Sequence, residues 1–300
     1  KQMNYIMIVI AYDCSNLKNN DVPIILIHGL MASQSWMVKL KDLIQMEYPD
    51  RLLTSIEIGY GLISSMFGLP DRYIREAAFQ INQSSNGSMC VDLIGHSQGG
   101  FVSRAYIQLF NEPYPTVRNF YSLAGALNGF DCPVGTNCGG FGKLAGFVRD
   151  NVYSKFMQYW ILPSMFWRDQ ANPDKFKSFQ PVLAKLNGEV DANLTKNFVN
   201  LKKFYTFYSE NDNVLRPPTT AIFDQWEDGQ LKTVEELQFY KENTFGLKTL
   251  KENGVWRRCK LNNYLHSDFI KLKVYEFFDD YFRQVILLEE GETDHLSECY

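Results

Sequence analysis

Residues 90–105 read CVDLIGHSQGGFVSRA and place one serine, Ser97, inside a G-x-S-x-G frame. The apolar run before Ser97 and the helical spacing after it predict a strand that turns directly into a helix. A serine on such a turn has a strained backbone, and only small residues two positions away leave room for the neighbouring chain. Gly95 and Gly99 occupy those positions. The pattern favours a nucleophile on a strand-to-helix turn over a chance glycine-serine turn.

The rest of the chain alternates apolar runs with segments of helical spacing, which is typical of a parallel sheet. We expect strands at 22–30, 52–58, 89–94, 117–124, 203–208 and 255–261, and helices at 36–48, 70–82, 100–110 and 268–286. No linker rich in Pro, Gly or Ser divides the 300 residues. The expected fold class is α/β, with a mostly parallel central sheet, helices on both faces and one inserted cap.

The expected single domain spans residues 1–300, with a core at about 22–125 and 201–286 and a cap at about 126–200. The cap contains an aromatic stretch at 153–167, YSKFMQYWILPSMFW. These side chains either pack the cap against the sheet or line an apolar cleft above Ser97, since ligand pockets favour such walls. The acidic tail at 289–300 is expected to be frayed.

Composition excludes several classes of partner. Lys and Arg total 30 against 34 Asp and Glu, and no dense basic run is present, so we expect no nucleic acid. No apolar run approaches the ~20 residues of a transmembrane helix, although transient contact with a membrane surface is compatible with the sequence. No pair of Cys-x-x-Cys motifs suggests zinc, and we expect neither a metal nor a cofactor. The oligomeric state is left open.

Two features together indicate the secretory pathway. Asn-x-Ser/Thr sequons occur at Asn82, Asn86 and Asn193. Cys132 and Cys138 bracket a short loop that a disulfide could close, while the pairing of the other four cysteines is left open. The apolar residues 5–12 are either the end of a secretory signal or an opening strand. We expect a secreted or lysosomal protein.

A serine hydroxyl needs a base within hydrogen-bond reach, and four histidines compete for that role. His96 adjoins Ser97, so its side chain should diverge from the serine. His28 ends a strand, where shaping the loop is the better interpretation, and His295 lies in the tail. His266 lies between the last strand and the closing helix, where the chain order serine, acid, histidine places a base.

The acid should follow the strand at 203–208, which leaves Glu210 and Asp212. We favour Asp212 because it lies further into the loop; the alternative is an Asx-turn residue. The backbone N–H after the serine and one from an earlier strand-to-helix loop should bind the developing oxyanion. Gln98 and Leu30 are the expected donors.

Taken in order, these motifs resemble the palmitoyl-protein thioesterase family over most of the chain. The similar stretches are IHGL at 27–30, EIG at 57–59, HSQGG at 96–100, FWRD at 166–169, the loop at 209–217 and FGLKTL at 245–250. The resemblance implies a lysosomal α/β-hydrolase that removes long-chain fatty acyl groups from cysteine thioesters or acyl-CoA-like carriers. Its substrate partners would be a fatty-acylated protein or peptide, or such a carrier.

Residue by residue, the resemblance implies Ser97 as nucleophile, Asp212 as acid, His266 as base, and Leu30 and Gln98 as oxyanion donors. The tail departs from this pattern. One family branch has leucine closely following its histidine, as in 295–297 (HLS) here. His295 follows the helix that should close the domain, and FGLK is more similar to the second branch. The branches differ in their preference for bulky acyl groups, so the substrate stays open.

Two rival functions fit the same residues. An oxygen-ester lipase or carboxylesterase would show the same turn and cap. A non-catalytic binding protein of this fold usually lacks one of the three catalytic residues, and all three candidates are present here.

Overall fold

The computed structural model describes residues 12–59, 61, 63–110, 113–131, 151–169, 172–179, 181–190 and 196–300. Its centre is a six-stranded sheet of order β2-β1-β3-β4-β5-β8, in which every neighbouring pair is parallel. The strands are β1 (Ile24–Ile27), β2 (Leu53–Ile56), β3 (Cys90–His96), β4 (Thr116–Leu123), β5 (Lys203–Tyr208) and β8 (Trp256–Lys260). All six expected strands are confirmed, with ends that differ by a few residues.

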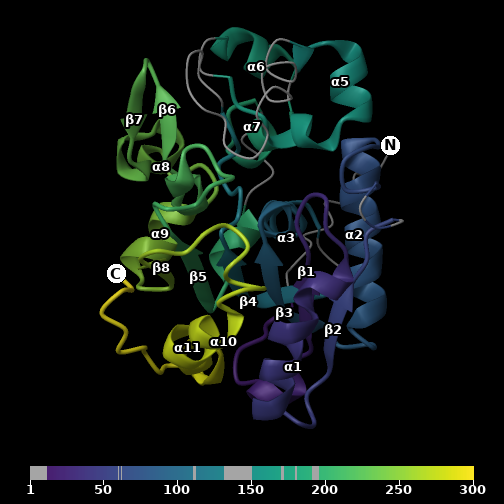
Figure 1. The fold of residues 1–300 in the computed structure, drawn as a ribbon, viewed down its shortest axis with the longest axis vertical. Coiled ribbons are helices and arrows are strands. Elements are labelled where there is room, and N and C mark those ends of the chain that lie inside the picture. The colour runs from purple at the N-terminus through teal and green to yellow at the C-terminus, as the bar shows by residue number, and fades with distance from the viewer. Residues whose placement is uncertain are drawn as a thin grey trace, which may run out of the picture.

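The crossover helices lie on both faces of the sheet. They are α1 (Val38–Glu47), which follows the 3-10 turn η2 (Gln34–Met37), α2 (Pro70–Ser84) and α3 (Gln98–Leu109). The step from β1 to β2 runs toward one edge, and the next two steps run back. Right-handed crossovers therefore put α1 on one face and α2 and α3 on the other. α1 packs against α10 (Val274–Phe277) and α2 against α3, as Figure 1 shows.

The expected helix at 268–286 begins later than predicted. A turn at 268–273 precedes α10, the π-helical segment η8 (Phe278–Phe282) and α11 (Arg283–Leu287). In this turn the Phe269 ring packs on those of Tyr264 and Phe277, with centroids 5.3 and 5.4 Å apart. We attribute the late start to this aromatic packing, which overrides the helical periodicity.

The described chain between β4 and β5 contains several short helices. They are α5 (Lys155–Trp160), η4 (Leu162–Phe166), α6 (Pro173–Phe179), α7 (Val182–Leu186) and η5 (Lys196–Asn200). Figure 1 shows α5, α6 and α7 gathered at one end of the molecule. The division of one domain into core and cap stays a prediction.

A second excursion separates β5 from β8. It contains η6 (Pro218–Ile222), the antiparallel hairpin of β6 (Gln225–Glu227) and β7 (Gln230–Lys232), η7 (Val234–Glu236), α8 (Gln238–Lys241) and α9 (Leu247–Glu252). The hairpin has no clear sequence pattern, because its strands have only three residues each.

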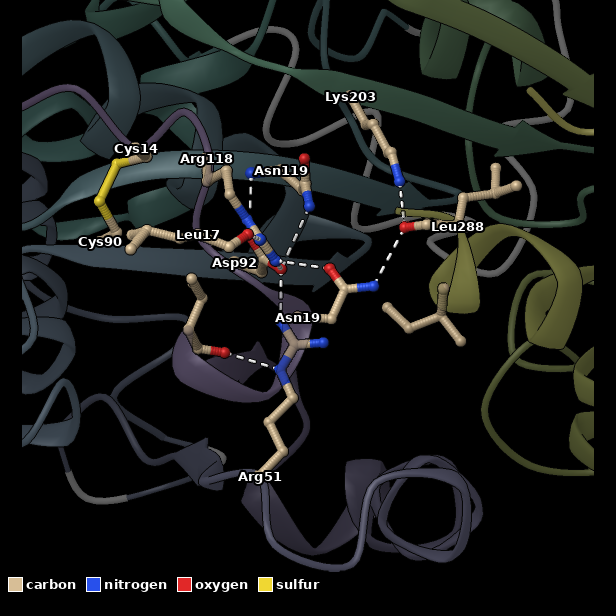
Figure 2. A network of polar contacts seen from close by, with 12 residues as sticks. Cys14, Leu17, Asn19, Arg51, Cys90, Asp92, Arg118, Asn119, Lys203 and Leu288 are labelled. Carbon is tan, nitrogen blue, oxygen red and sulfur yellow. Dashed lines mark hydrogen bonds and ion pairs between the residues drawn. A yellow bond between two sulfur atoms is a disulfide. The ribbon is translucent and has the colours of Figure 1, made fainter. Parts of the chain in front are cut away.

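A buried polar network ties the sheet to the chain's N-terminal segment (Figure 2). Asp92 of β3 is fully buried and accepts hydrogen bonds from Arg51 at 2.5 Å and from Arg118 at 2.6 Å. Burial alone would raise the pKa of Asp92, but the two guanidinium groups lower it below its usual value. Removing one partner of a buried ion pair typically costs about 3–5 kcal/mol. The apolar run therefore holds a charge that the strand pattern does not reveal.

The tail is not frayed, contrary to expectation. A disulfide joins Cys299 to Cys259 of β8, and backbone hydrogen bonds link Tyr300 to Arg258 in both directions at 2.9 Å. The side chain of Asp294 is nearly buried and accepts hydrogen bonds from Tyr205 and Arg257. A strand edge and a covalent bond hold this acidic segment.

Some of the features that indicated the secretory pathway lie in the described part of the structure. A second disulfide joins Cys14 to Cys90, and Asn82 and Asn86 are exposed. The predictions for Cys132, Cys138 and Asn193, and for residues 5–11, lie outside the described residues.

Candidate active site

Ser97 lies on a strained turn between β3 and α3. Its φ of 57° and ψ of −123° are costly for a residue with a side chain. A Cβ atom on Gly95 would lie 2.5 Å from the Gly99 carbonyl oxygen, and one on Gly99 would lie 2.2 Å from the Ile27 carbonyl oxygen. Only glycine fits either position, so the spacing predicted from the G-x-S-x-G frame is confirmed. With the strand order, this turn makes the fold that of an α/β-hydrolase.

Asp212 and His266 meet although they are distant in sequence. Asp212 lies in the loop after β5, and its Oδ2 accepts a hydrogen bond from His266 Nδ1 at 2.7 Å. The other carboxylate oxygen, Oδ1, accepts the backbone N–H groups of Val214 at 2.8 Å and Leu215 at 2.9 Å. Burial raises the pKa of Asp212, but His266 and these hydrogen bonds outweigh it and lower the pKa below the usual value. The carboxylate is thus fixed at both oxygens.

The competing residues lie elsewhere. Glu210 is largely exposed and forms a surface ion pair with Lys260 at 2.7 Å. His28, the first residue after β1, is buried, with Nε2 3.0 Å from a Glu57 oxygen. His295 is exposed in the tail.

A cavity of about 800 Å³ has Ser97 and His266 in its wall, together with Leu30 and Gln98. Apolar and aromatic side chains form most of the remaining lining, among them Met66, Phe67, Phe130, Met157, Phe166 and Trp167. Phe166 and Trp167 also pack on Phe101 and Phe130, with ring centroids about 5 Å apart. The aromatic stretch therefore contributes to a cleft beside Ser97, as one interpretation predicted, and two of its rings also pack on neighbouring buried residues.

His96 contacts the loop of His266, a contact that was not predicted from the sequence. Its Nε2–H donates to the His266 carbonyl oxygen at 2.8 Å, and the two ring centroids are 4.9 Å apart. Burial, followed by the charge of His266, lowers the pKa of His96 to about 3, so its ring stays neutral. No local pattern could reveal a contact between residues 170 positions apart.

Within the residues that the structure describes, no group of three or more His, Cys, Asp or Glu side chains could hold a metal ion. No helix in the same part of the chain is long and apolar enough to cross a membrane.

Comparison with known proteins places this site in a family. The family model described as palmitoyl protein thioesterase matches residues 23–266. Palmitoyl-protein thioesterase 3 of Dictyostelium discoideum is 31% identical over 77% of this chain and 81% of its own length. Lysosomal thioesterase PPT2 of Rattus norvegicus is 28% identical over 82% of each chain.

Among solved structures, a putative lipase from Acinetobacter baumannii is 13% identical, covering 88% of this chain and 84% of its own, with a TM-score of 0.46. This likeness is too distant to bear on function. The family match covers the strands and loops that carry Ser97, Asp212 and His266. The chain therefore belongs to the palmitoyl protein thioesterase family of hydrolase enzymes.

Proposed function

We propose that this protein hydrolyses long-chain fatty acyl thioesters, either S-acyl cysteines of proteins and peptides or acyl-CoA-like carriers. The observation that carries the proposal is one apolar cavity of about 800 Å³ with Ser97 and His266 in its wall and Asp212 bonded to His266. This volume lies in the range of about 300–1,000 Å³ that ligand pockets usually have. Two relatives are a palmitoyl-protein thioesterase and a lysosomal thioesterase, which supports the choice of substrate.

In the proposed mechanism, Ser97 attacks the thioester carbonyl while His266 Nε2 takes the serine proton. Asp212 holds His266 Nδ1–H, so that Nε2 carries the lone pair, and stabilises the imidazolium that forms. The thiol leaves with that proton, and a water activated by His266 then releases the fatty acid from Ser97. Atoms balance as one thioester plus one water giving one thiol and one acid.

Two backbone N–H groups serve as oxyanion donors in this proposal. Gln98 is the first residue of α3, where a helix leaves its N–H groups without intrahelical acceptors, and Leu30 follows β1 on the facing loop. Losing one such donor typically costs about 100- to 1,000-fold in rate.

Burial of the acyl chain in this apolar cavity would favour long acyl chains. Each methylene that leaves water contributes about 0.8 kcal/mol, so partial burial already selects for length. We further propose that the protein acts in the lysosome as one domain with a cap at about 126–200. Disulfides of the kind seen here persist in oxidising compartments such as the secretory pathway.

The first test compares turnover of a palmitoyl thioester with that of the matched oxygen ester. We expect faster turnover of the thioester; a strong preference for the oxygen ester would instead indicate a lipase or carboxylesterase. A fluorophosphonate probe should label the wild-type protein and fail to label Ser97→Ala. Folded wild-type protein that takes no label would indicate a non-catalytic binding protein.

The second test assigns the base. His266→Ala should lose nearly all turnover, whereas His295→Ala should keep it because His295 is exposed in the tail. Near-normal turnover by His266→Ala would overturn the assignment.

A further inference from the structure

We infer that Ser65 is a positioning residue that holds both oxyanion donors in place; this inference rests on the proposed function. Ser65 lies in the turn at 63–67, between β2 and α2, and is fully buried. Its Oγ accepts the backbone N–H of Met31 at 2.8 Å. Its carbonyl oxygen accepts the side-chain Nε2 of Gln98 at 3.2 Å. One residue thus bonds to the loop after β1 and to the turn after β3.

Both of these hydrogen bonds of Ser65 are made at or beside a proposed oxyanion donor. Met31 follows Leu30 directly, so the bond to Ser65 fixes the peptide plane on the far side of Leu30 from its own N–H. The φ of Met31 is 53°, a conformation that costs free energy in a residue with a side chain and persists only where surrounding bonds enforce it. Gln98 supplies the second donor through its backbone, and its side chain is held by Ser65. The two donors are therefore fixed relative to one another.

The same turn forms part of the wall of the acyl cavity. Met66 and Phe67 line the cavity directly after Ser65. The Met66 carbonyl accepts the N–H of Leu162 at 2.9 Å, and the N–H of Gly68 donates to Trp160 at 3.0 Å. The turn is thus bonded to the cap on one side and to the oxyanion loops on the other. Such support makes the donors preorganised, which is what oxyanion stabilisation requires.

The test separates positioning from stability. Ser65→Ala removes the acceptor of the Met31 N–H. Ser65→Cys replaces that oxygen by a sulfur atom, which accepts hydrogen bonds only weakly, and keeps the side-chain volume nearly constant. We expect both variants to lose about ten- to hundredfold in kcat for a palmitoyl thioester, since small misplacements cost that much. KM should change less than about threefold, because only the transition state carries the oxyanion.

A second measurement uses the affinity for an inhibitor that mimics the oxyanion. Binding of a palmityl trifluoromethyl ketone, which forms a tetrahedral adduct with the serine, should weaken by the same factor as kcat. Binding of an unreactive palmityl thioether should be unchanged. A structural role alone would lower the melting temperature and leave the ratio of these two affinities constant, and that result would overturn the inference.

Matched variants complete the design. Ser85→Ala also removes a buried hydroxyl that bonds to backbone, in this case the Asn82 carbonyl oxygen at the end of α2, and should keep wild-type kcat. Gln98→Met removes the other contact and keeps the backbone donor. Combined with Ser65→Ala, it should cost less than the sum of the two single changes. Additive losses would contradict a shared role.

The wild-type protein separates the two proposals. Wild-type turnover with unimpaired Ser65→Ala and Ser65→Cys would overturn only the role of Ser65. Wild-type protein that hydrolyses neither the thioester nor the oxygen ester would overturn the proposed function, and the role of Ser65 with it.

Discussion

Replacing Asp212 by asparagine is the sharpest probe of the candidate site. Asp212 Oδ1 accepts two backbone N–H groups, those of Val214 and Leu215, while Oδ2 faces His266 Nδ1. In Asp212→Asn only one side-chain atom is an oxygen. If it stays with the two backbone donors, the amide NH₂ faces His266 Nδ1 and forces that nitrogen to accept. His266 then carries its proton on Nε2 and cannot take the proton of Ser97.

The opposite amide orientation is costly. It would leave both backbone N–H groups without an acceptor, at about 1–3 kcal/mol each. Even the lower total of about 2 kcal/mol restricts that orientation to about one molecule in thirty. Loss of the productive tautomer in a serine triad costs about 10⁴-fold in kcat, which corresponds to about 5.4 kcal/mol. We therefore expect kcat of Asp212→Asn to fall by between thirtyfold and about 10⁴-fold.

The assay is steady-state hydrolysis of a palmitoyl thioester, with the rate of fluorophosphonate labelling of Ser97 measured in parallel. Both rates should fall while the melting temperature changes little, because the asparagine keeps the backbone hydrogen bonds. Glu210→Gln is the matched control, since Glu210 lies in the same loop but is exposed and bonded only to Lys260 among the contacts described. Its turnover should equal that of the wild type. Loss of less than tenfold in Asp212→Asn would refute the reasoning.

Three further predictions concern stability and folding. Burial raises the pKa of Asp224 to about 6, so the folded state binds its proton more tightly than the unfolded state, and stability should fall as pH rises from 4 to 6; thermal melts of Asp224→Asn should show a flatter pH profile there. Replacing Cys259 and Cys299 by serine opens a loop of 40 residues and should cost about 4 kcal/mol in denaturant unfolding; an unchanged midpoint would show that the disulfide is dispensable. Gly99→Ala should yield no folded, probe-reactive protein, because its Cβ meets backbone at 2.2 Å; normal labelling would disprove this.

The sequence was sufficient for the sheet and for the turn at Ser97 because each leaves a local signal. Buried parallel strands are continuous apolar runs, and the turn at Ser97 needs glycine at fixed spacing. Asp212 and His266 were found from chain order along those strands. Their hydrogen bond agrees with that order, although their catalytic roles stay predictions.

Several features that were not predicted depend on contacts between distant segments. Ser65 finds its hydrogen-bond partners only where the turn before α2 meets the loop after β1 and the start of α3. Asp92 sits in an apolar run that predicts a strand, yet its charge is balanced by Arg51 and Arg118 from other elements. The tail was expected to fray because it is an acidic terminal segment. Cysteine pairing cannot be deduced from sequence alone, and the disulfide from Cys299 reverses that expectation.

The two pKa shifts beside His266 act in opposite ways but have one consequence. The lowered pKa of Asp212 keeps that carboxylate charged in mildly acidic conditions. The lowered pKa of His96, about 3, keeps its ring neutral in the same range, so it continues to donate to the His266 carbonyl and adds no positive charge. Asp212 therefore stays a charged acceptor for His266 Nδ1, and His96 stays a neutral donor to the His266 carbonyl oxygen.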